Sequence, residues 1–162
     1  MHLSLQTDYA LRILMALSSF GEQMSVDDIA RRYGISRNHL AKVAHRLQAL
    51  ELVQATRGRC GGLRLAKPAE EINVGAVVRA MERLDGFVEC MQPKSNGCPV
   101  VGACGLQGAL SRALADFLRC LDQYQLSDLT PHPLRFAALL EEKPQEPTPE
   151  VARFVCTEIG NG

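Results

Sequence analysis

The chain has 162 residues, of which 46% are hydrophobic and 22% are charged, and its 18 basic residues balance 18 acidic ones. This length suits one modest hydrophobic core with an appended segment. No uninterrupted apolar stretch approaches the roughly 20 residues that cross a bilayer, which excludes a transmembrane helix.

Charge is distributed unevenly along the chain. Residues 1–67 carry ten Lys or Arg against five Asp or Glu, and the remainder is acidic. A basic first part suits a surface that faces phosphate, although an ordinary solvated charge distribution gives the same pattern.

The first 20 residues resemble a signal peptide only superficially. Asp8 and Arg12 interrupt their apolar pattern, and no small-residue cleavage site follows. We therefore expect a cytoplasmic protein whose six cysteines are reduced thiols or metal ligands rather than disulfides. The segment predicts an amphipathic helix with Thr7 as N-cap and Asp8 in its first turn. Its apolar stripe is formed by Tyr9, Ile13, Leu17 and Phe20.

Residues 25–50 have the pattern of a helix-turn-helix. Ser25 and Asp28 resemble a capping box that begins a short helix over 26–33, and Gly34 ends it. Ser36 is expected to cap the next helix, over 37–50, whose core face is formed by Leu40, Val43 and Leu47. This second helix would be the recognition helix. Its exposed start supplies the candidate contacts to the major groove and to phosphate: Ser36, Arg37, Asn38 and Lys42.

Residues 52–67 predict a β-hairpin wing, because short apolar segments flank a glycine-rich turn. Arg57 and Arg59 lie in that turn and suit a narrow minor groove. Any one of these polar or basic residues, taken alone, is read as a solvated surface group. As a set on two adjacent elements they favour DNA binding.

Two further helices are expected after the wing. One opens at Asn73 or Gly75 and runs to Gly86. The other covers residues 106–125 and places five apolar side chains on one seam: Leu106, Leu110, Leu114, Phe117 and Leu121. Such a seam needs a partner, and we favour a second copy of the chain over packing onto its own domain. Ser127 is expected to cap a short last helix, and the chain from Lys143 onward is expected to be flexible.

Cys90, Cys98 and Cys104 stand close together in a loop that contains several Gly and Pro residues. Thiolates at such spacing bind soft metals or iron–sulfur clusters, and the Gly and Pro residues let the backbone fold tightly round a centre. The spacing differs from that of zinc ribbons and of bacterial ferredoxins. Two alternatives stay open: three free cysteines, or a structural zinc completed by a histidine.

Five stretches together resemble the winged-helix iron–sulfur repressors of the IscR/NsrR type, and most closely the nitric-oxide-sensing NsrR branch. They are TDYALRILMAL, YGISRNHLAKVAHRL, TRGRCGGLRLAKPAEEINVGAVVRAME, the three-cysteine loop and LADFLRCLDQYQLSDL, and they cover nearly everything between residues 1 and 130.

The resemblance implies a mainly α fold with a defined division of the chain. A winged helix-turn-helix domain would cover residues 1–85, a cluster loop 86–105, a dimerisation helix 106–130, and a C-terminal helix with a flexible tail 131–162. The resemblance also implies a homodimer that binds double-stranded operator DNA. Its affinity would fall when nitric oxide reacts with a four-iron, four-sulfur (4Fe-4S) cluster.

Three cysteines leave one iron of such a cluster without a protein thiolate. In IscR-like relatives a histidine three residues beyond the last cysteine fills the place, but the matching residue here is Gln107. In NsrR-like relatives a carboxylate from the first helix of the other subunit does so, and the matching residue is Asp8. The resemblance thus gives four metal ligands: Asp8, Cys90, Cys98 and Cys104.

The residues alone support a simpler role for Asp8. It would be a first-turn acid that favours the helix dipole by about 0.3–1 kcal/mol. Cys60, in the turn of the wing, departs from the residues usual in the family. We expect Cys60 to be a wing-tip thiol rather than a ligand.

Two other functions remain compatible with the sequence. An iron-responsive repressor of the same family would use cluster loss under iron limitation as its signal, and Asp8 weighs against it. A redox or electron-transfer protein would use the cluster as a carrier, and the helix-turn-helix with its wing weighs against that. We expect no enzymatic activity, because we find no nucleophile–base pair, phosphate-binding loop or HExxH-type motif.

Overall fold

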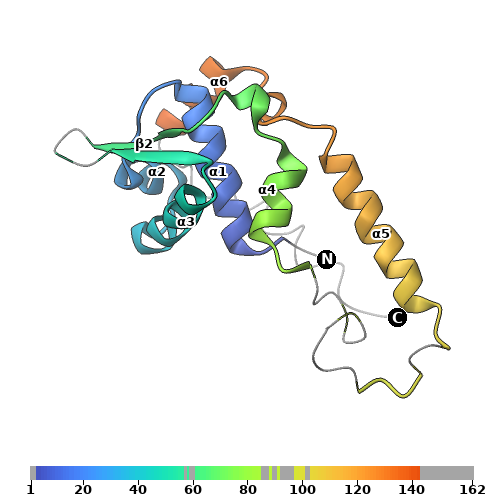
Figure 1. The fold of residues 1–162 in the computed structure, drawn as a ribbon. Helices are drawn as coiled ribbons and strands as arrows, with labels where there is room; N and C mark the ends of the chain where they lie inside the picture. The colour runs from blue at the N-terminus through green and yellow to red at the C-terminus, as the bar shows by residue number, and fades with distance from the viewer. Residues whose placement is uncertain are drawn as a thin grey trace, which may run out of the picture.

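Helix α1 (Leu5–Phe20) is the central element of the fold. The computed structural model describes residues 3–56, 58, 61–84, 88, 91, 97–100 and 103–142. Five elements pack against α1 (Figure 1): α3 (Arg37–Ala49), β2 (Gly62–Leu65), α4 (Val74–Met81), the 3₁₀ turn η4 (Leu126–Leu129) and α6 (Pro133–Glu141). The predicted apolar stripe of α1 is confirmed, since Ile13 and Leu17 are buried and Tyr9 and Phe20 pack partly buried against the same core.

Helix α1 begins earlier than predicted. Ser4, not Thr7, is its N-cap, and the Ser4 side-chain oxygen accepts a hydrogen bond from the Thr7 backbone N–H at 3.3 Å. Thr7 is fully buried in the first turn. The Ser4 backbone N–H in turn donates to the Glu82 carboxylate at 2.6 Å. This bond ties the start of α1 to the residue that follows α4.

Helices α2 (Val26–Tyr33) and α3 form the predicted helix-turn-helix. The Ser25 hydroxyl accepts a hydrogen bond from the Asp28 backbone N–H at 3.0 Å and donates to the Asp28 carboxylate at 2.6 Å. Gly34 ends α2 with a φ of 64°, a left-handed conformation that glycine adopts without steric cost. Six side chains from the two helices are buried in the core: Ile29, Ala30, Leu40, Val43, Ala44 and Leu47.

The predicted wing is an antiparallel pair of strands, β1 (Val53–Thr56) and β2 (Gly62–Leu65). Met24 joins β2 through two backbone hydrogen bonds with Leu63, of 3.0 and 2.7 Å. Gly62 permits this approach, because a Cβ there would lie 2.7 Å from the Met24 carbonyl oxygen. The base of the wing is thus anchored to the body. The turn residues Arg57, Arg59 and Cys60 lie outside the described residues.

Helix α4 is capped by Asn73 and ends at Met81, before the predicted stop at Gly86. It ends there because Glu82 has an extended backbone, with φ −90° and ψ 152°, and its carboxylate is bound to the start of α1. The expectation of a helix reaching Gly86 is therefore wrong.

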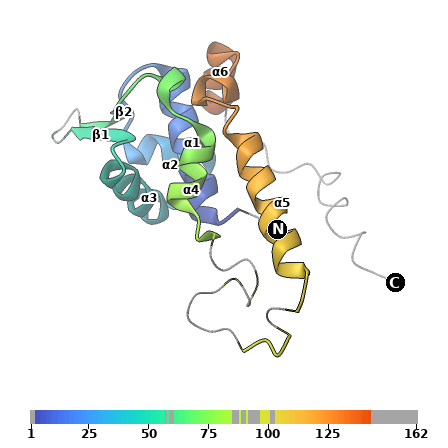
Figure 2. The same ribbon diagram turned by 45° about the vertical axis from the view of Figure 1, so that its right-hand side comes forward.

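Helix α5 (Leu106–Leu121) packs against α4 and is attached at its C-terminal end, whereas its N-terminal end extends away from the winged domain (Figure 2). Arg79 of α4 and Asp122 form a two-pronged ion pair. The Asn73 side-chain amide donates to the Asp122 carbonyl oxygen at 2.8 Å. These bonds make α5 an arm fixed at one end.

The predicted seam of α5 is not buried within the chain. Leu106 is 55% exposed. The other four members are half-buried: Leu110, Leu114, Phe117 and Leu121. Leu118, which the predicted seam omits, is buried. A single chain therefore leaves much of the apolar surface of α5 in contact with solvent.

The C-terminal elements return to α1. Ser127 does not cap the last helix, as had been expected, but lies inside η4. Helix α6 starts at Pro133. Proline suits this position because a backbone N–H in the first turn of a helix has no helical acceptor, so its absence costs nothing. The predicted mainly α fold with a two-stranded wing is confirmed. None of the helices described is both long and apolar enough for a membrane span, and the predicted tail, 143–162, lies outside the described residues.

Candidate DNA-binding surface and cluster segment

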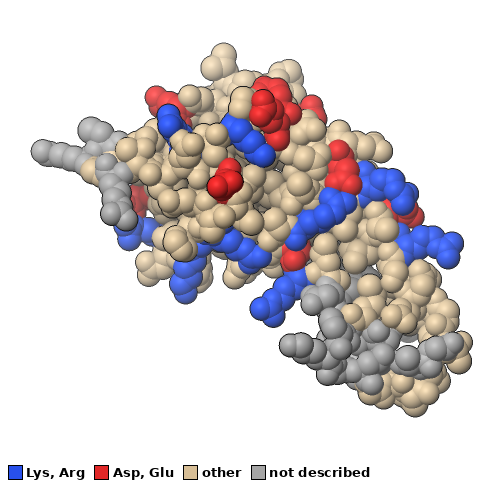
Figure 3. All heavy atoms as spheres, in the orientation of Figure 1, with Lys and Arg blue, Asp and Glu red and all other residues tan. Residues whose placement is uncertain are grey.

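The first turns of α3 present the predicted DNA contacts to solvent. Ser36, Arg37, Asn38 and Lys42 are all exposed, whereas the opposite face of α3 is in the core. Figure 3 shows basic side chains along the edge of the molecule where Figure 1 places α3. This surface can offer hydrogen-bonding groups and positive charge to a DNA groove.

Two of these residues differ from the prediction in detail. The predicted N-cap position of Ser36 is confirmed, but its side chain makes no capping hydrogen bond. Its backbone carbonyl instead accepts from the N–H groups of His39 and Leu40, each at 3.1 Å. Arg37 forms an ion pair with Asp27 of α2, in which the side chains are 65% and 62% exposed. Such a surface pair is weak enough for a phosphate to displace.

The cysteine segment connects α4 to α5. Cys98 is half-buried and Cys104 is exposed. Cys104 directly precedes Gly105, the N-cap residue of α5, and its sulfur accepts a hydrogen bond from the Leu106 N–H at 3.4 Å. Its exposed sulfur is a soft ligand, so Cys104 is suited to bind a soft metal. Cys90 lies outside the described residues.

Asp8 lies in the first turn of α1, with its side chain 39% exposed. Its carboxylate pairs with Arg12, with 3.0 Å between Oδ2 and Nε. The Arg12 guanidinium lies 5.6 Å from the centroid of the Tyr33 ring. Burial raises the pKa of Tyr33 to about 12, so its hydroxyl stays neutral beside this pair. Asp8 is thus bound within the chain and accessible from outside it.

The structure does not bring the described ligands together within one chain. Among the residues described, no three His, Cys, Asp or Glu side chains form a group able to hold a metal ion, so Asp8, Cys98 and Cys104 are not joined. The two thiols nevertheless fit a soft metal or an iron–sulfur cluster by their chemistry.

Sequence reasoning missed Arg46 of α3. Its guanidinium donates to the Ala80 carbonyl oxygen of α4 at 2.7 Å and to the Gln6 side-chain oxygen of α1 at 3.4 Å. The available signal was its position one turn beyond Lys42 on the solvent-facing side of the recognition helix. That position does not distinguish a solvated arginine from one that joins two other helices.

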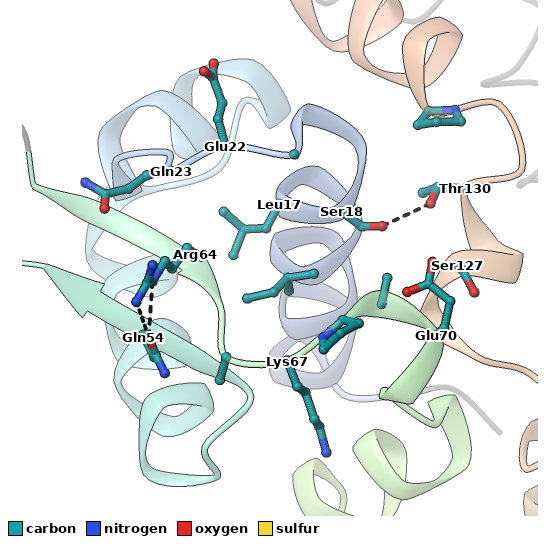
Figure 4. A pocket seen from close by; sticks show the side chains of 16 residues that line it. Leu17, Ser18, Glu22, Gln23, Gln54, Arg64, Lys67, Glu70, Ser127 and Thr130 are labelled. Carbon is teal, nitrogen blue, oxygen red and sulfur yellow. Dashed lines mark hydrogen bonds between the residues drawn. The ribbon is translucent and has the colours of Figure 1, made fainter.

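A groove of about 910 Å³ lies between the end of α1, the wing and η4 (Figure 4). The Arg64 guanidinium is bound to the Gln54 side-chain oxygen at 2.7 and 3.1 Å. Glu22 and Lys67 point away from the groove in opposite directions (Figure 4). The charged groups of an active site converge on one point, whereas those of this groove do not.

Known proteins match most of the chain. Residues 3–132 match the Rrf2 family, described as an iron-dependent transcriptional regulator. The HTH-type transcriptional regulator NsrR of Halalkalibacterium halodurans is 44% identical over 146 residues, which are 89% of this chain and 100% of that one. NsrR of Bacillus subtilis is 42% identical over 145 residues, 88% of this chain and 99% of that one.

Solved structures share the fold. IscR of T. potens has a TM-score of 0.64 and 21% sequence identity, over 84% of this chain and 90% of that one. The oxidized form of Staphylococcus aureus CymR has a TM-score of 0.64 and 25% identity, over 82% of this chain and 98% of that one.

Proposed function

Because the chain belongs to the Rrf2 family of iron-dependent transcriptional regulators, we propose that it is a DNA-binding repressor whose iron–sulfur cluster senses nitric oxide. The resemblance inferred from the sequence is confirmed at the level of the family, and the relatives are regulators rather than enzymes. To this family assignment we add three proposals: the iron–sulfur cofactor, nitric oxide as the signal, and the homodimer.

The exposed start of α3 is the observation that carries the DNA-binding part. The Asn38 amide can bond an adenine edge in two places, and Lys42 can neutralise a phosphate. Arg57 and Arg59 of the wing would reach a narrow minor groove. In a homodimer, two copies of α3 would read half-sites roughly 34–36 Å apart, or a multiple of that distance.

The cluster would be held by Cys90, Cys98 and Cys104 of one chain and by Asp8 of the other. Cys104 would present its exposed sulfur at the start of helix α5. The exposed Asp8 carboxylate would be the hard, weak ligand of the set. When bound, the cluster supplies iron, to which nitric oxide binds directly.

Asp8 then has two alternative partners, the cluster held by the other chain and Arg12 of its own. When the Asp8 carboxylate binds the cluster of the other chain, it holds the first turn of α1 in place. When it is released from the cluster, it pairs with Arg12 of its own chain. Because α1 packs against α3, the position of α1 affects the separation of the two recognition helices. A coupling of about 1–3 kcal/mol, or roughly 5–150-fold in DNA affinity, is typical of such linkage.

The test is the DNA affinity of oxygen-free, cluster-loaded protein before and after nitric oxide. A duplex selected from a random pool by the loaded protein serves as the probe. We expect the affinity to fall roughly 5–150-fold. Equal affinity in the two states contradicts the proposal, as does oxygen-free protein that contains no inorganic sulfide.

An iron-responsive repressor is the second candidate, favoured by the description of the family as iron-dependent. In that case an iron chelator, rather than nitric oxide, releases the duplex. Titrating the same loaded protein with each agent separates the two functions.

A further inference from the structure

Three helix ends meet at one corner of the winged domain: the start of α1, the end of α3 and the end of α4. The Ser4 backbone N–H donates to the Glu82 carboxylate at 2.6 Å. Arg46 of α3 donates through Nη2 to the Ala80 carbonyl oxygen at 2.7 Å and through Nη1 to Oε1 of Gln6 at 3.4 Å. One side chain of the recognition helix therefore contacts both of the other helices.

The chemistry of these contacts suits an arginine. Ala80 lies in the last turn of α4, where carbonyl groups have no helical partner and the helix dipole is negative. A guanidinium carries its donors in a rigid planar fork, so it can bridge two acceptors at a set separation. A lysine ammonium is a point charge on a flexible stem and does not fix that geometry.

Both helices that Arg46 contacts lead to proposed cluster ligands. The chain passes from α4 into the cysteine segment. Asp8 lies in the same turn of α1 as Gln6, and its backbone N–H donates to the Ser4 carbonyl oxygen at 3.0 Å. A movement of the first turn of α1 or of the end of α4 therefore displaces an acceptor of Arg46.

The corner also has room to move. A hollow of about 220 Å³ lies between the first turn of α1 and the outer face of α3. It is lined by Leu5, Gln6 and Tyr9 on α1 and by His39, Lys42, Val43 and Arg46 on α3. A shift of α1 against α3 at this place meets open space rather than a packed core.

We propose that Arg46 is a positioning residue that couples the cluster ligands to the recognition helix, a role that rests on the function proposed above. With both acceptors in place, Arg46 holds α3 in the orientation that reads the operator. When the first turn of α1 or the end of α4 moves, Arg46 loses an acceptor and α3 is released. Arg46 thus sets the size of the response to the signal.

The test compares Arg46→Met with Lys42→Met, which removes the same charge from α3 one turn earlier. Duplex affinity of each cluster-loaded variant is measured before and after nitric oxide. In Arg46→Met the ratio of the two affinities should fall from the wild-type value, roughly 5–150, towards one, with the cluster absorption unchanged. Lys42→Met should weaken both states alike and keep the ratio.

Arg46→Lys separates charge from geometry. We expect Arg46→Lys to keep the wild-type salt dependence of DNA binding. Its ratio of DNA affinities before and after nitric oxide should nevertheless fall towards one, as in Arg46→Met. The cluster-free protein gives an independent readout. Amide hydrogen exchange in residues 4–11 should be faster in both Arg46 variants than in wild type and Lys42→Met.

The outcomes distinguish this role from the function on which it rests. If wild type responds to nitric oxide and Arg46→Met keeps the same ratio and the same exchange rates, Arg46 is only a phosphate contact and the coupling role is wrong. If wild type itself shows a ratio of one, the sensor function fails and the coupling role fails with it.

Discussion

At the scale of single residues, Asp8 is the group on which the proposed chemistry depends most. Its pair with Arg12 joins two side chains that are each 39% exposed. Exposed pairs of this kind typically contribute about 0–1 kcal/mol, because solvent screens them and both side chains lose freedom. The Asp8 carboxylate can therefore exchange Arg12 for another partner with little loss of stability. A deeply buried ion pair would not allow that exchange.

Replacing Asp8 by Ala tests it as a ligand. We expect a changed absorption spectrum and faster loss of iron to a chelator, because the carboxylate is removed while the three thiolates remain. The free energy of unfolding of the cluster-free chain should change by less than about 1 kcal/mol. Asp116→Ala, which removes another exposed ion-paired carboxylate, should leave the spectrum unchanged. Asp8 is rejected as a ligand if its variant keeps both the wild-type spectrum and the response to nitric oxide.

At the scale of elements, the sequence predicted the boundaries of α2, which local groups determine. The start and end of α2 depend on Ser25 and Gly34, which flank the helix, and on Asp28 in its first turn, and both were predicted. The start of α1 was misplaced although its cap is local, because Ser4 and Thr7 are both residue types that cap helices. The end of α4 involves the bond between Ser4 and Glu82, which are 78 residues apart. No local pattern reveals such a bond, and both boundaries were predicted wrongly. The bridging role of Arg46 escaped notice for the same reason.

Helix α2 has eight residues, too few to be stable without its cap and its tertiary contacts. Ser25→Ala should lower the free energy of unfolding by about 1 kcal/mol, because the hydroxyl that caps α2 is lost. Ser36→Ala is the matched control, since Ser36 occupies an N-cap position without a capping bond. Urea unfolding of the two cluster-free variants should give a smaller loss for Ser36→Ala. Equal losses would show that the capping bond contributes nothing particular.

The same substitution has a defined pH dependence. The hydrogen bond from Ser25, followed by the charge of Arg31, holds the pKa of Asp28 below its ordinary value of 3.8. A lowered pKa stabilises the folded state above pH 3.8, and this contribution is lost as the pH falls through the folded pKa. The difference in unfolding free energy between wild type and Ser25→Ala should therefore shrink in that acid range.

At the scale of the whole molecule, one chain is incomplete in two respects. It leaves the seam of α5 half-buried or exposed, and it does not join Asp8 to the cysteines within the described residues. A helix periodicity in the sequence was sufficient to locate the seam. It could not identify what covers the seam, because periodicity reports which face is apolar and not which surface meets it. A second copy of the chain would complete both features at once.

The oligomeric state tests that arrangement. Leu110→Glu places a carboxylate in the middle of the seam. Burial against a second chain would leave this carboxylate unpaired, at a cost of several kcal/mol. Because about 1.4 kcal/mol changes an equilibrium constant tenfold, the dimer dissociation constant should rise tenfold or more. Sedimentation should give wild type twice the mass of one chain, and should give Leu110→Glu a mass closer to that of a single chain. Leu134→Glu is the control, because Leu134 on α6 is 85% exposed and lies outside the seam. Leu110→Glu should also lose DNA affinity, since a monomer reads one half-site only. A Leu110→Glu protein that keeps the dimer mass and the wild-type circular dichroism would place the dimer contact elsewhere on the molecule.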